Sequence, residues 1–155
     1  LRSPALEREP ACRALSRYAR EMAQRVGLRV SYDLHPDIEG LPEPIEEALW
    51  KVGQEALANI EKHAQAHNVL LHMSCRDGHV FMKITDDGVG LPADLCQRQK
   101  EHEISYESPA GHYGLSGMWE RVKNVHGRIS IHSADEHGTV IEVTLPLVEA
   151  PLIPT

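Results

Sequence analysis

Residues 44–64 read PIEEALWKVGQEALANIEKHA and carry the strongest helical pattern of the chain. Their apolar positions recur every three or four residues, at Ile45, Ala48, Leu49, Val52, Ala56, Ile60 and Ala64. Such spacing places one apolar stripe along a single helix, and Pro44 suits the first turn of that helix. The segment is therefore predicted to be one long helix with one buried face.

Three polar residues of this helix interrupt the flank of its apolar stripe. With 100° of rotation per residue, Asn59 falls about 40° from the middle of the stripe, Glu55 about 80° and Lys62 about 100°, all on the same side. The pattern predicts that these side chains line one edge of the buried face. The alternative is an ordinary helix edge with a salt link and a capped asparagine.

Other polar residues of the helix have simpler interpretations. Glu46 and Glu47 point well away from the stripe and are expected to be solvated. His63 lies at the centre of the stripe, where a buried, hydrogen-bonded structural histidine is the ordinary explanation.

The segments around this helix predict an α+β fold. Helical spacing and a closing glycine indicate helices over about 10–26 and 115–125, ended by Gly27 and Gly127. Alternating apolar residues indicate a strand near 28–34, and two hairpins follow, one of which turns at Asp77-Gly78. The predicted strands lie at 28–34, 69–75, 80–84, 129–131 and 141–147. We expect a two-layer sandwich with a mixed, mostly antiparallel sheet and helices on one face.

The first of the predicted hairpins ends in a glycine-rich acidic segment. Strand parity carries Asp86 onto the same face as the apolar residues before it, whereas Asp87 faces the other way. Gly88 and Gly90 allow the backbone to turn tightly and let a ligand come close. An inward carboxylate there can accept a hydrogen bond from an amino group. A plain surface turn is the competing interpretation.

A second glycine-rich segment, GHYGLSGM at 111–118, opens directly into a helix. It presents backbone N–H groups and the positive end of a helix dipole to an anion. Thr139 shares strand parity with the apolar residues that follow it, so its hydroxyl faces the same interior as Asp86. A glycine-rich helix start and an ordinary strand threonine are the alternatives.

Composition limits how such a pocket can work. The 155 residues include 16 basic and 23 acidic side chains, a net charge of −7, and 5% aromatic residues. That balance argues against a nucleic-acid surface, which needs a basic patch or exposed rings. A bound phosphate must therefore be held by magnesium and backbone amides.

Cysteine and histidine spacing predicts neither disulfides nor a structural metal. The three cysteines lie far apart and are expected to be reduced thiols. Among ten histidines, only His132 and His137 approach a ligand spacing. We expect neither a membrane span nor a leader within these residues, because no apolar run is long enough and no charged segment precedes one. Because the sequence starts at Leu1, we expect it to be a piece of a longer protein. We expect this piece to be a cytoplasmic domain, and an anchor in the inner membrane would be compatible with the parent protein.

Four of these segments in order resemble a known superfamily. The segments are QEALAN through KHA at 54–64, DDGVG at 86–90, GHYGL with GM and ER at 111–121, and Gly138-Thr139. They resemble the N, G1, G2 and final Gly-Thr boxes of the GHKL ATPases, and within them the catalytic and ATP-binding domain of two-component sensor histidine kinases. The KHA and HYGL forms resemble the nitrate/nitrite-sensor branch.

The resemblance implies the Bergerat fold, Mg²⁺ and ATP as cofactors, and a set of site residues. Asn59 would coordinate magnesium with Glu55 nearby, Lys62 and His63 would approach the phosphates, and Asp86 would take the adenine amino group. Gly88 and Gly90 would shape the base pocket, residues 91–113 would be the ATP lid, and the start of the next helix would wrap the phosphates through Gly114, Leu115, Gly117 and Met118. The other residues expected to contact the nucleotide are Leu91, His112, Tyr113 and Thr139. Residues 1–150 would form the single domain and 151–155 a tail.

Two departures from the family pattern matter. Too few residues precede the long helix to hold the family's dimerising hairpin with its phosphoacceptor histidine, and the glycine run before Thr139 is reduced to EHGT at 136–139. We therefore expect a monomeric fragment that binds ATP without phosphorylating itself. Its partners would be the dimerisation domain of a homodimeric parent kinase and a response regulator. The alternatives are an anti-sigma-factor-type serine kinase of the same fold and a non-enzymatic α+β interaction module.

Overall fold

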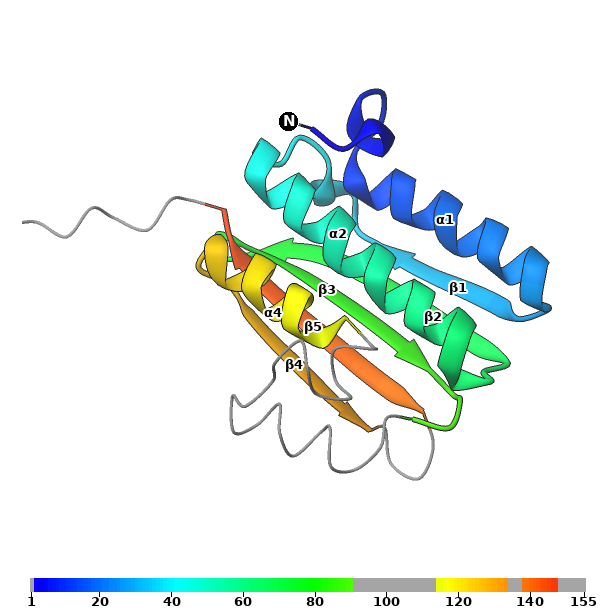
Figure 1. The fold of residues 1–155 in the computed structure, drawn as a ribbon. Helices are drawn as coiled ribbons and strands as arrows, with labels where there is room; N and C mark the ends of the chain where they lie inside the picture. Colours follow the sequence, from blue (N-terminus) through cyan, green and yellow to red (C-terminus); the bar gives the residue numbers. More distant parts are fainter. Residues whose placement is uncertain (1, 91–113, 134–137, 148–155) are drawn as a thin grey trace, which may run out of the picture.

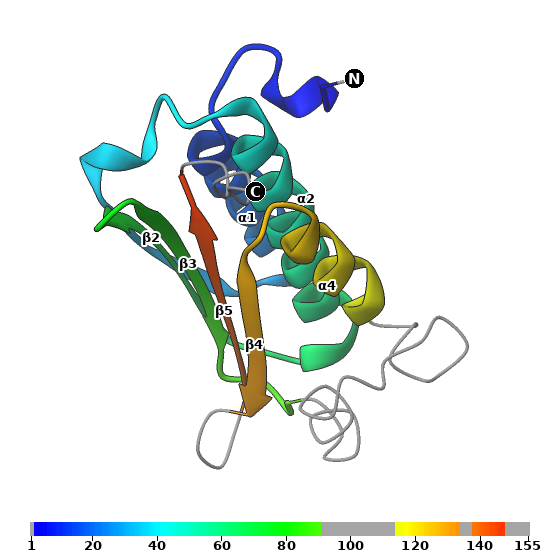
Figure 2. The same cartoon turned by 90° about the vertical axis from the view of Figure 1, so that its left-hand side faces the viewer.

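A computed structural model of the chain describes residues 2–90, 114–133 and 138–147. It has two layers, a five-stranded sheet and the helices α1, α2 and α4, which lie on one face of that sheet (Figures 1 and 2). The elements are η1 (Pro4–Leu6), α1 (Ala11–Val26), β1 (Arg29–Leu34), η2 (Pro36–Ile38), α2 (Glu43–Asn59), η3 (Ile60–Ala64), β2 (Asn68–Arg76), β3 (His79–Asp86), α4 (Leu115–Asn124), β4 (Arg128–Ser133) and β5 (Thr139–Pro146). The predicted α+β sandwich is confirmed.

The sheet has the strand order β1-β2-β3-β5-β4. Strands β1 and β2 are parallel, and α2 forms the crossover that a parallel pair requires. The other neighbours are antiparallel. The predicted turn between β2 and β3 is present, with left-handed φ angles of 55° at Asp77 and 74° at Gly78, as a two-residue hairpin turn of the I′ type needs. The sheet is therefore mixed and mostly antiparallel.

The core lies between the sheet and the helices. Alternate residues of β2, β3 and β5 point toward the helices and are buried, among them Leu71, Met73, Val80, Met82, Ile84, Val143 and Leu145. Helix α1 approaches α2 closely at Gly53, where a Cβ atom would lie 2.6 Å from Cδ2 of Leu15. On the edge strand β1, Tyr32 and Leu34 stay exposed, because fewer elements cover an edge than a centre.

The prediction of one α-helix through residue 64 is wrong in its last turn. The α-helix ends at Asn59, and Ile60–Ala64 form a π-helical turn. A π turn closes i→i+5 hydrogen bonds and rotates less per residue, so residues beyond Asn59 leave the phase of the stripe. Lys62 and His63 are both exposed, and a buried structural role for His63 is contradicted.

The two glutamates expected to be solvated both have protein partners. The Glu46 side chain is 3% exposed, and its carboxylate accepts the backbone N–H of Ala11 at the start of α1. Glu47 Oε2 accepts a hydrogen bond of 2.7 Å from Ser3 Oγ. The expectation failed because it considered α2 in isolation, whereas the N-terminal segment packs over this end of the helix. A carboxylate at a helix start is favoured by the helix dipole.

Helix α4 ends earlier than its closing glycine suggests. Its last residue is Asn124, and the left-handed position after it is His126, with φ 62°. Gly127 serves packing instead, because a Cβ atom there would lie 2.3 Å from Cδ2 of Leu145 and 2.7 Å from the Thr144 carbonyl oxygen.

Candidate functional site

Asp86 is the inward carboxylate that strand parity predicts. It is the last residue of β3, pairs with Thr139 of β5 and is 4% exposed. Its Oδ1 accepts the backbone N–H of Gly88 at 2.8 Å. Burial raises the pKa of the Asp86 carboxyl and neighbouring Asp87 adds to this, while hydrogen bonds from the backbones of Gly88 and Thr139 oppose it. Thr139 is 9% exposed and belongs to the same interior.

The end of β3 lies in close backbone contact with the start of β5. Gly138 has φ 86°, and a Cβ atom there would lie 1.9 Å from the carbonyl oxygen of Asp86. Gly90 has φ 77°, and a Cβ atom there would lie 2.9 Å from the carbonyl oxygen of Gly138 and 3.5 Å from Oγ of Ser133. Both glycines are thus required by left-handed backbone and by close approach. The two sequence segments that contain them form one structural unit.

Asp87 has a different role from its neighbour. It faces away from the core and is exposed, and its carboxylate accepts 2.8 Å hydrogen bonds from the backbone N–H groups of His67 and Asn68 and from Asn68 Nδ2. These bonds lower the pKa of Asp87 to about 2, with the Asn68 side chain as the largest cause. Sequence reasoning missed this anchor between β3 and the start of β2, because the partners lie about 20 residues away.

Helix α2 and the start of α4 bring two predicted residues together. Gly114 precedes α4 with φ 68°, and a Cβ atom on it would lie 2.2 Å from Oε1 of Glu55. Glu55 and Asn59 are one helical turn apart and both half-buried. The predicted flank is confirmed for Glu55 and Asn59, and Glu55 lies where α2 meets the glycine-rich start of α4. For Lys62 the prediction is wrong, because the π turn takes this residue out of the helical phase and leaves it exposed.

The start of α4 offers main-chain donors and buried side chains. Leu115 and Met118 are each 1% exposed, and their side chains belong to the core. These two residues can therefore contact a ligand only through backbone atoms. The N–H of Met118 already donates to the Gly114 carbonyl at 3.1 Å. The preceding N–H groups of this 10-residue helix have no intrahelical acceptor, as in every helix start. Gly117 has no atom within 4 Å of a Cβ position.

The remaining predicted positions divide into two groups. Lys62 and His63 lie in the π turn directly after Asn59, next to the Glu55–Asn59 flank in sequence. Leu91, His112, Tyr113 and the whole segment 91–113 lie outside the described residues.

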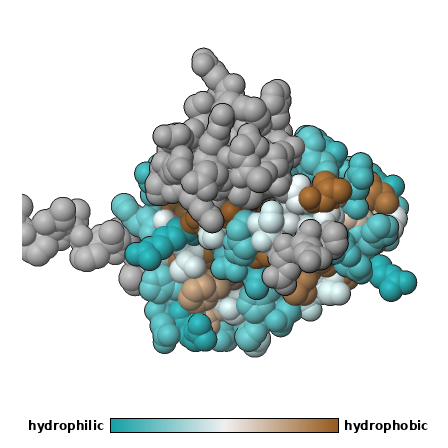
Figure 3. Space-filling model, turned by 90° about the horizontal axis from the view of Figure 1, so that it is seen from below, coloured by the Kyte–Doolittle hydropathy of each residue, from teal (hydrophilic) through white to brown (hydrophobic). Residues whose placement is uncertain are grey.

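These parts meet at one end of the sandwich. In Figure 1 the C-terminal ends of α2 and β3 lie at the lower end of the molecule, and the pairing of Asp86 with Thr139 places the start of β5 there. Figure 3 shows the molecule from below, and the coloured residues visible in that view are a mixture of hydrophilic and hydrophobic ones. A separate groove of about 490 Å³ lies on the opposite face of the sheet and contains none of the predicted site residues.

The residues at this end fit a magnesium-bound purine nucleotide. Asp86 is a buried acceptor suited to an exocyclic amino group, and the side-chain oxygens of Glu55 and Asn59 are the hard donors that Mg²⁺ prefers. The left-handed glycines keep Cβ atoms out of the space beside Asp86 and Glu55. A helix start supplies N–H groups for phosphate.

Comparison with known proteins agrees with this geometry. Residues 45–149 match the family described as "Histidine kinase-, DNA gyrase B-, and HSP90-like ATPase". The chain belongs to this ATPase family, and within it to the catalytic ATPase domains of sensor histidine kinases. This membership argues against the non-enzymatic interaction module.

Its curated relatives are sensor kinases. The chain is 31% identical to the sensor histidine kinase YxjM of Bacillus subtilis, over 87% of this chain and 30% of that protein. It is 33% identical to the signal transduction histidine-protein kinase/phosphatase UhpB of Salmonella typhimurium, over 94% of this chain and 26% of that protein. A match to the NarQ homolog of Haemophilus influenzae, 32% identical over 62% of this chain and 15% of that protein, supports the predicted branch. The chain spans about a third or less of these relatives.

Solved structures agree on the fold. The catalytic domain of histidine kinase ThkA superposes with a TM-score of 0.68 at 15% identity, covering 88% of this chain and 90% of that one. A blue-light activated histidine kinase of Erythrobacter litoralis gives the same TM-score at 20% identity, covering 90% of this chain and 42% of that one. Among the described residues, no helix combines the length and apolar character of a membrane span.

Proposed function

We propose that this chain binds Mg·ATP at the end of the sandwich where α2, β3, α4 and β5 meet, and that it supplies the γ-phosphate to a histidine on the dimerisation domain of its parent kinase. From there the phosphate would pass to a response regulator. The observation that carries the proposal is the buried carboxylate of Asp86, held at the end of β3 by the backbone around it.

Asp86 would select adenine. A carboxylate is an acceptor only, so it pairs with an exocyclic amino group and rejects a base that presents a carbonyl oxygen at that place. Its orientation is set by the N–H of Gly88 and by its pairing with Thr139. Gly90 and Gly138 keep the neighbouring surface free of side chains, which lets the flat base approach the backbone.

Asn59 and Glu55 would hold the magnesium ion, and the start of α4 would hold phosphate. Bound magnesium would neutralise phosphate charge and polarise the γ-phosphoryl group. Gly114 brings the first N–H groups of α4 beside Glu55, so metal ligands and anion donors lie together. Lys62 and His63, exposed in the π turn after Asn59, would approach the phosphates. The chain thus positions the nucleotide and leaves the acceptor histidine to its partner domain.

Replacing Asp86 with asparagine tests the adenine assignment. The variant loses a charge-assisted hydrogen bond worth about 1.5–3 kcal/mol, so affinity for ATP and ADP should fall about 10- to 100-fold in calorimetric titration. Asp87→Asn is the matched control, because this neighbouring carboxylate faces away from the core and the variant should keep its nucleotide affinity. An equal loss for GTP in Asp86→Asn would show that Asp86 is only structural.

Replacing Asn59 with alanine tests the magnesium assignment. ATP affinity is measured in excess magnesium and again in EDTA, and the magnesium-dependent gain should disappear in Asn59→Ala. Gln54→Ala serves as control, since Gln54 projects from the other side of the helix. Unchanged affinity of Asn59→Ala in magnesium would refute this role.

Transfer chemistry distinguishes the histidine kinase from the serine kinase of the same fold. The chain is incubated with γ-labelled ATP and the dimerisation domain of its parent. Acid-labile label on that domain is the expected result. Acid-stable label on a serine of a partner protein would favour the anti-sigma-factor type instead.

A further inference from the structure

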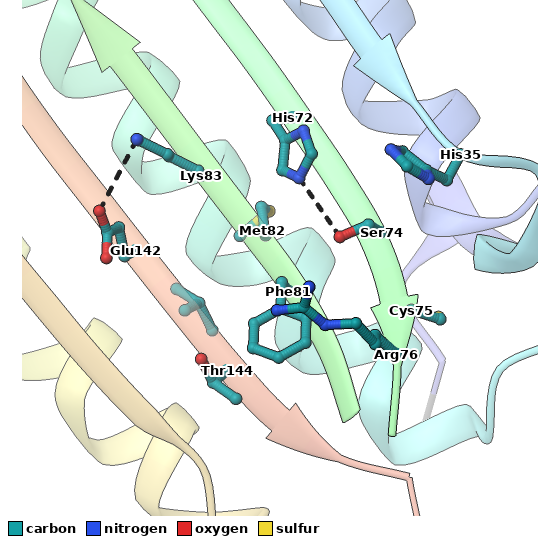
Figure 4. Close-up of a pocket in the computed structure, with 11 residues that line it drawn as sticks. His35, His72, Ser74, Cys75, Arg76, Phe81, Met82, Lys83, Glu142 and Thr144 are labelled. Atoms are coloured by element: carbon teal, nitrogen blue, oxygen red, sulfur yellow. Dashed lines mark hydrogen bonds and ion pairs between the residues drawn. The ribbon is translucent and has the colours of Figure 1, made fainter. Parts of the chain in front are cut away.

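Two histidines and an aspartate converge on the face of the sheet that the helices leave open. Asp33 and His35 are two residues apart at the end of β1, so both project to the same side. His72 of the parallel strand β2 stands opposite Asp33 in the strand register. Figure 4 shows the imidazoles of His35 and His72 on neighbouring segments, with Ser74 beside His72.

The three side chains approach one another closely. His72 Nδ1 lies 2.8 Å from Asp33 Oδ2, and His35 Nε2 lies 3.9 Å from Asp33 Oδ1. The two imidazole rings are 5.6 Å apart between centroids, with an interplanar angle of 76°. One ligand atom from each residue can be chosen so that all three lie within 4.8 Å of one another.

We propose that Asp33, His35 and His72 form a binding site for a divalent transition-metal cation of the zinc class. Zinc binds imidazole nitrogen and carboxylate oxygen at about 2.0–2.2 Å, which places the ligand atoms of a tetrahedral site about 3.3 Å apart. The separations from Asp33, 2.8 Å to His72 and 3.9 Å to His35, lie on either side of this value, and all three ligand atoms lie within 4.8 Å of one another. Asp33 and His35 are exposed, so side-chain rotation can bring the ligand atoms to zinc distances. A simple His–Asp hydrogen bond would need only His72 and Asp33, whereas His35 adds a third ligand.

The surroundings hold these ligands in place. Ser74 Oγ lies 3.2 Å from Nε2 of His72, the outer contact that orients a histidine binding metal through Nδ1. The backbone N–H of His35 donates to the Met73 carbonyl at 3.0 Å, which fixes the end of β1 beside β2. The remaining coordination positions face solvent and the adjoining groove, leaving room for water or an outside ligand.

The basic side chains that line the same groove, Arg76 and Lys83, each have an acidic partner. Arg76 Nε lies 4.0 Å from Oδ2 of Asp77. Lys83 stands opposite His72 in the register of β2 and β3, but its Nζ lies 3.9 Å from Oε1 of Glu142 on β5. That carboxylate offsets the lysine charge. The cluster shares no residue with the proposed nucleotide site, so this proposal stands independently of the proposed function.

Zinc titration of the chain, free of any histidine tag, tests the site. Calorimetry in nucleotide-free buffer, after treatment with chelator, should show one zinc ion per chain. At a free zinc concentration 100-fold above Kd, the melting temperature should rise by about 5–10 °C and return on addition of EDTA. Magnesium should give no comparable shift, because it prefers an all-oxygen site.

Substitutions locate the ion. Asp33→Asn, His35→Gln and His72→Gln should each lower zinc affinity at least tenfold, with circular dichroism confirming that each variant is folded. His79→Gln is the control, because His79 is an exposed histidine whose Nδ1 lies 2.9 Å from the Asp77 carbonyl oxygen, outside the cluster. The proposal is overturned if no zinc binds, or if binding persists unchanged in the folded Asp33→Asn and His35→Gln variants.

Discussion

Replacing Gly138 with alanine tests whether main-chain contact between the start of β5 and the end of β3 builds the proposed nucleotide site. Gly138 has φ 86°, and its added Cβ would lie 1.9 Å from the carbonyl oxygen of Asp86, 2.8 Å from its carbonyl carbon and 3.0 Å from Cα of Asp87. All three atoms belong to the backbone, so no flexible side chain can move aside. The substitution must displace either the end of β3 or the start of β5.

The expected loss of stability has two parts. A left-handed residue with a side chain costs about 1–2 kcal/mol, and forcing packed backbone apart costs about 1–3 kcal/mol more. Gly138→Ala should therefore lower the free energy of unfolding by about 2–5 kcal/mol. Gly78→Ala isolates the first part, because Gly78 has φ 74° and no atom within 4 Å of its Cβ position; its loss should be about 1–2 kcal/mol.

Urea unfolding followed by circular dichroism measures both losses, and calorimetry under folding conditions measures ADP affinity. Because the overlap falls on Asp86, Gly138→Ala should bind ADP at least about tenfold more weakly, while Gly78→Ala should bind as the parent does. Equal stability losses in the two variants, together with unchanged ADP affinity in Gly138→Ala, would refute the reasoning.

The adjacent aspartates at the end of β3 and the glycines around α4 give three further predictions. Hydrogen bonds lower the pKa of Asp87 from 3.8 to about 2. Its ionised form therefore contributes about 1 kcal/mol, after allowance for exposure, to the free energy of unfolding above pH 4, and this contribution is lost toward pH 2. In urea titrations at acid pH, the difference in stability between the parent and Asp87→Asn should close over that interval. Burial raises the pKa of Asp86 above 3.8, so ATP affinity should increase as pH rises through that pKa, and a pH-independent affinity would contradict an ionised acceptor. Gly127→Ala should lower the stability measured in thermal melts by about 1–3 kcal/mol, because its Cβ would overlap Leu145 and the Thr144 carbonyl oxygen. Gly117→Ala should instead raise the stability by about 0.5–1 kcal/mol, because Gly117 lies in α4 and no atom lies within 4 Å of its Cβ position.

Local periodicity predicts what depends on one element at a time. The parity of β3 places Asp86 inside and Asp87 outside, and the helical phase of α2 places Glu55 and Asn59 on one flank, as the structure shows. Each of these inferences needs only the regular geometry of a strand or helix. The same reasoning failed for His63, because a π turn breaks the phase on which the inference rests.

Contacts between distant segments could not be predicted from the pattern. Glu46 is buried because the start of α1, 35 residues earlier, donates to its carboxylate. The parallel register of β1 and β2 brings His72 opposite Asp33, 39 residues earlier, a contact that spacing along the chain does not reveal. Knowledge of which strands are neighbours would have revealed both the Asp33–His72 pair and its third partner, His35.

The shortened glycine run before Thr139 has a physical explanation in these contacts. A glycine-rich segment is needed where backbone meets backbone, and Gly138 is the residue whose Cβ would overlap the carbonyl of Asp86. A single glycine at position 138 is enough to let the start of β5 approach the Asp86 carbonyl. Gly90 allows the segment after β3 to approach the carbonyl of Gly138 in the same way. The surface beside Asp86 is therefore made by main chain of the segments that follow β3 and precede β5. Because main-chain shape does not depend on side-chain charge, a domain with net charge −7 can present such a surface to a nucleotide while magnesium and helix N–H groups offset the phosphate charge.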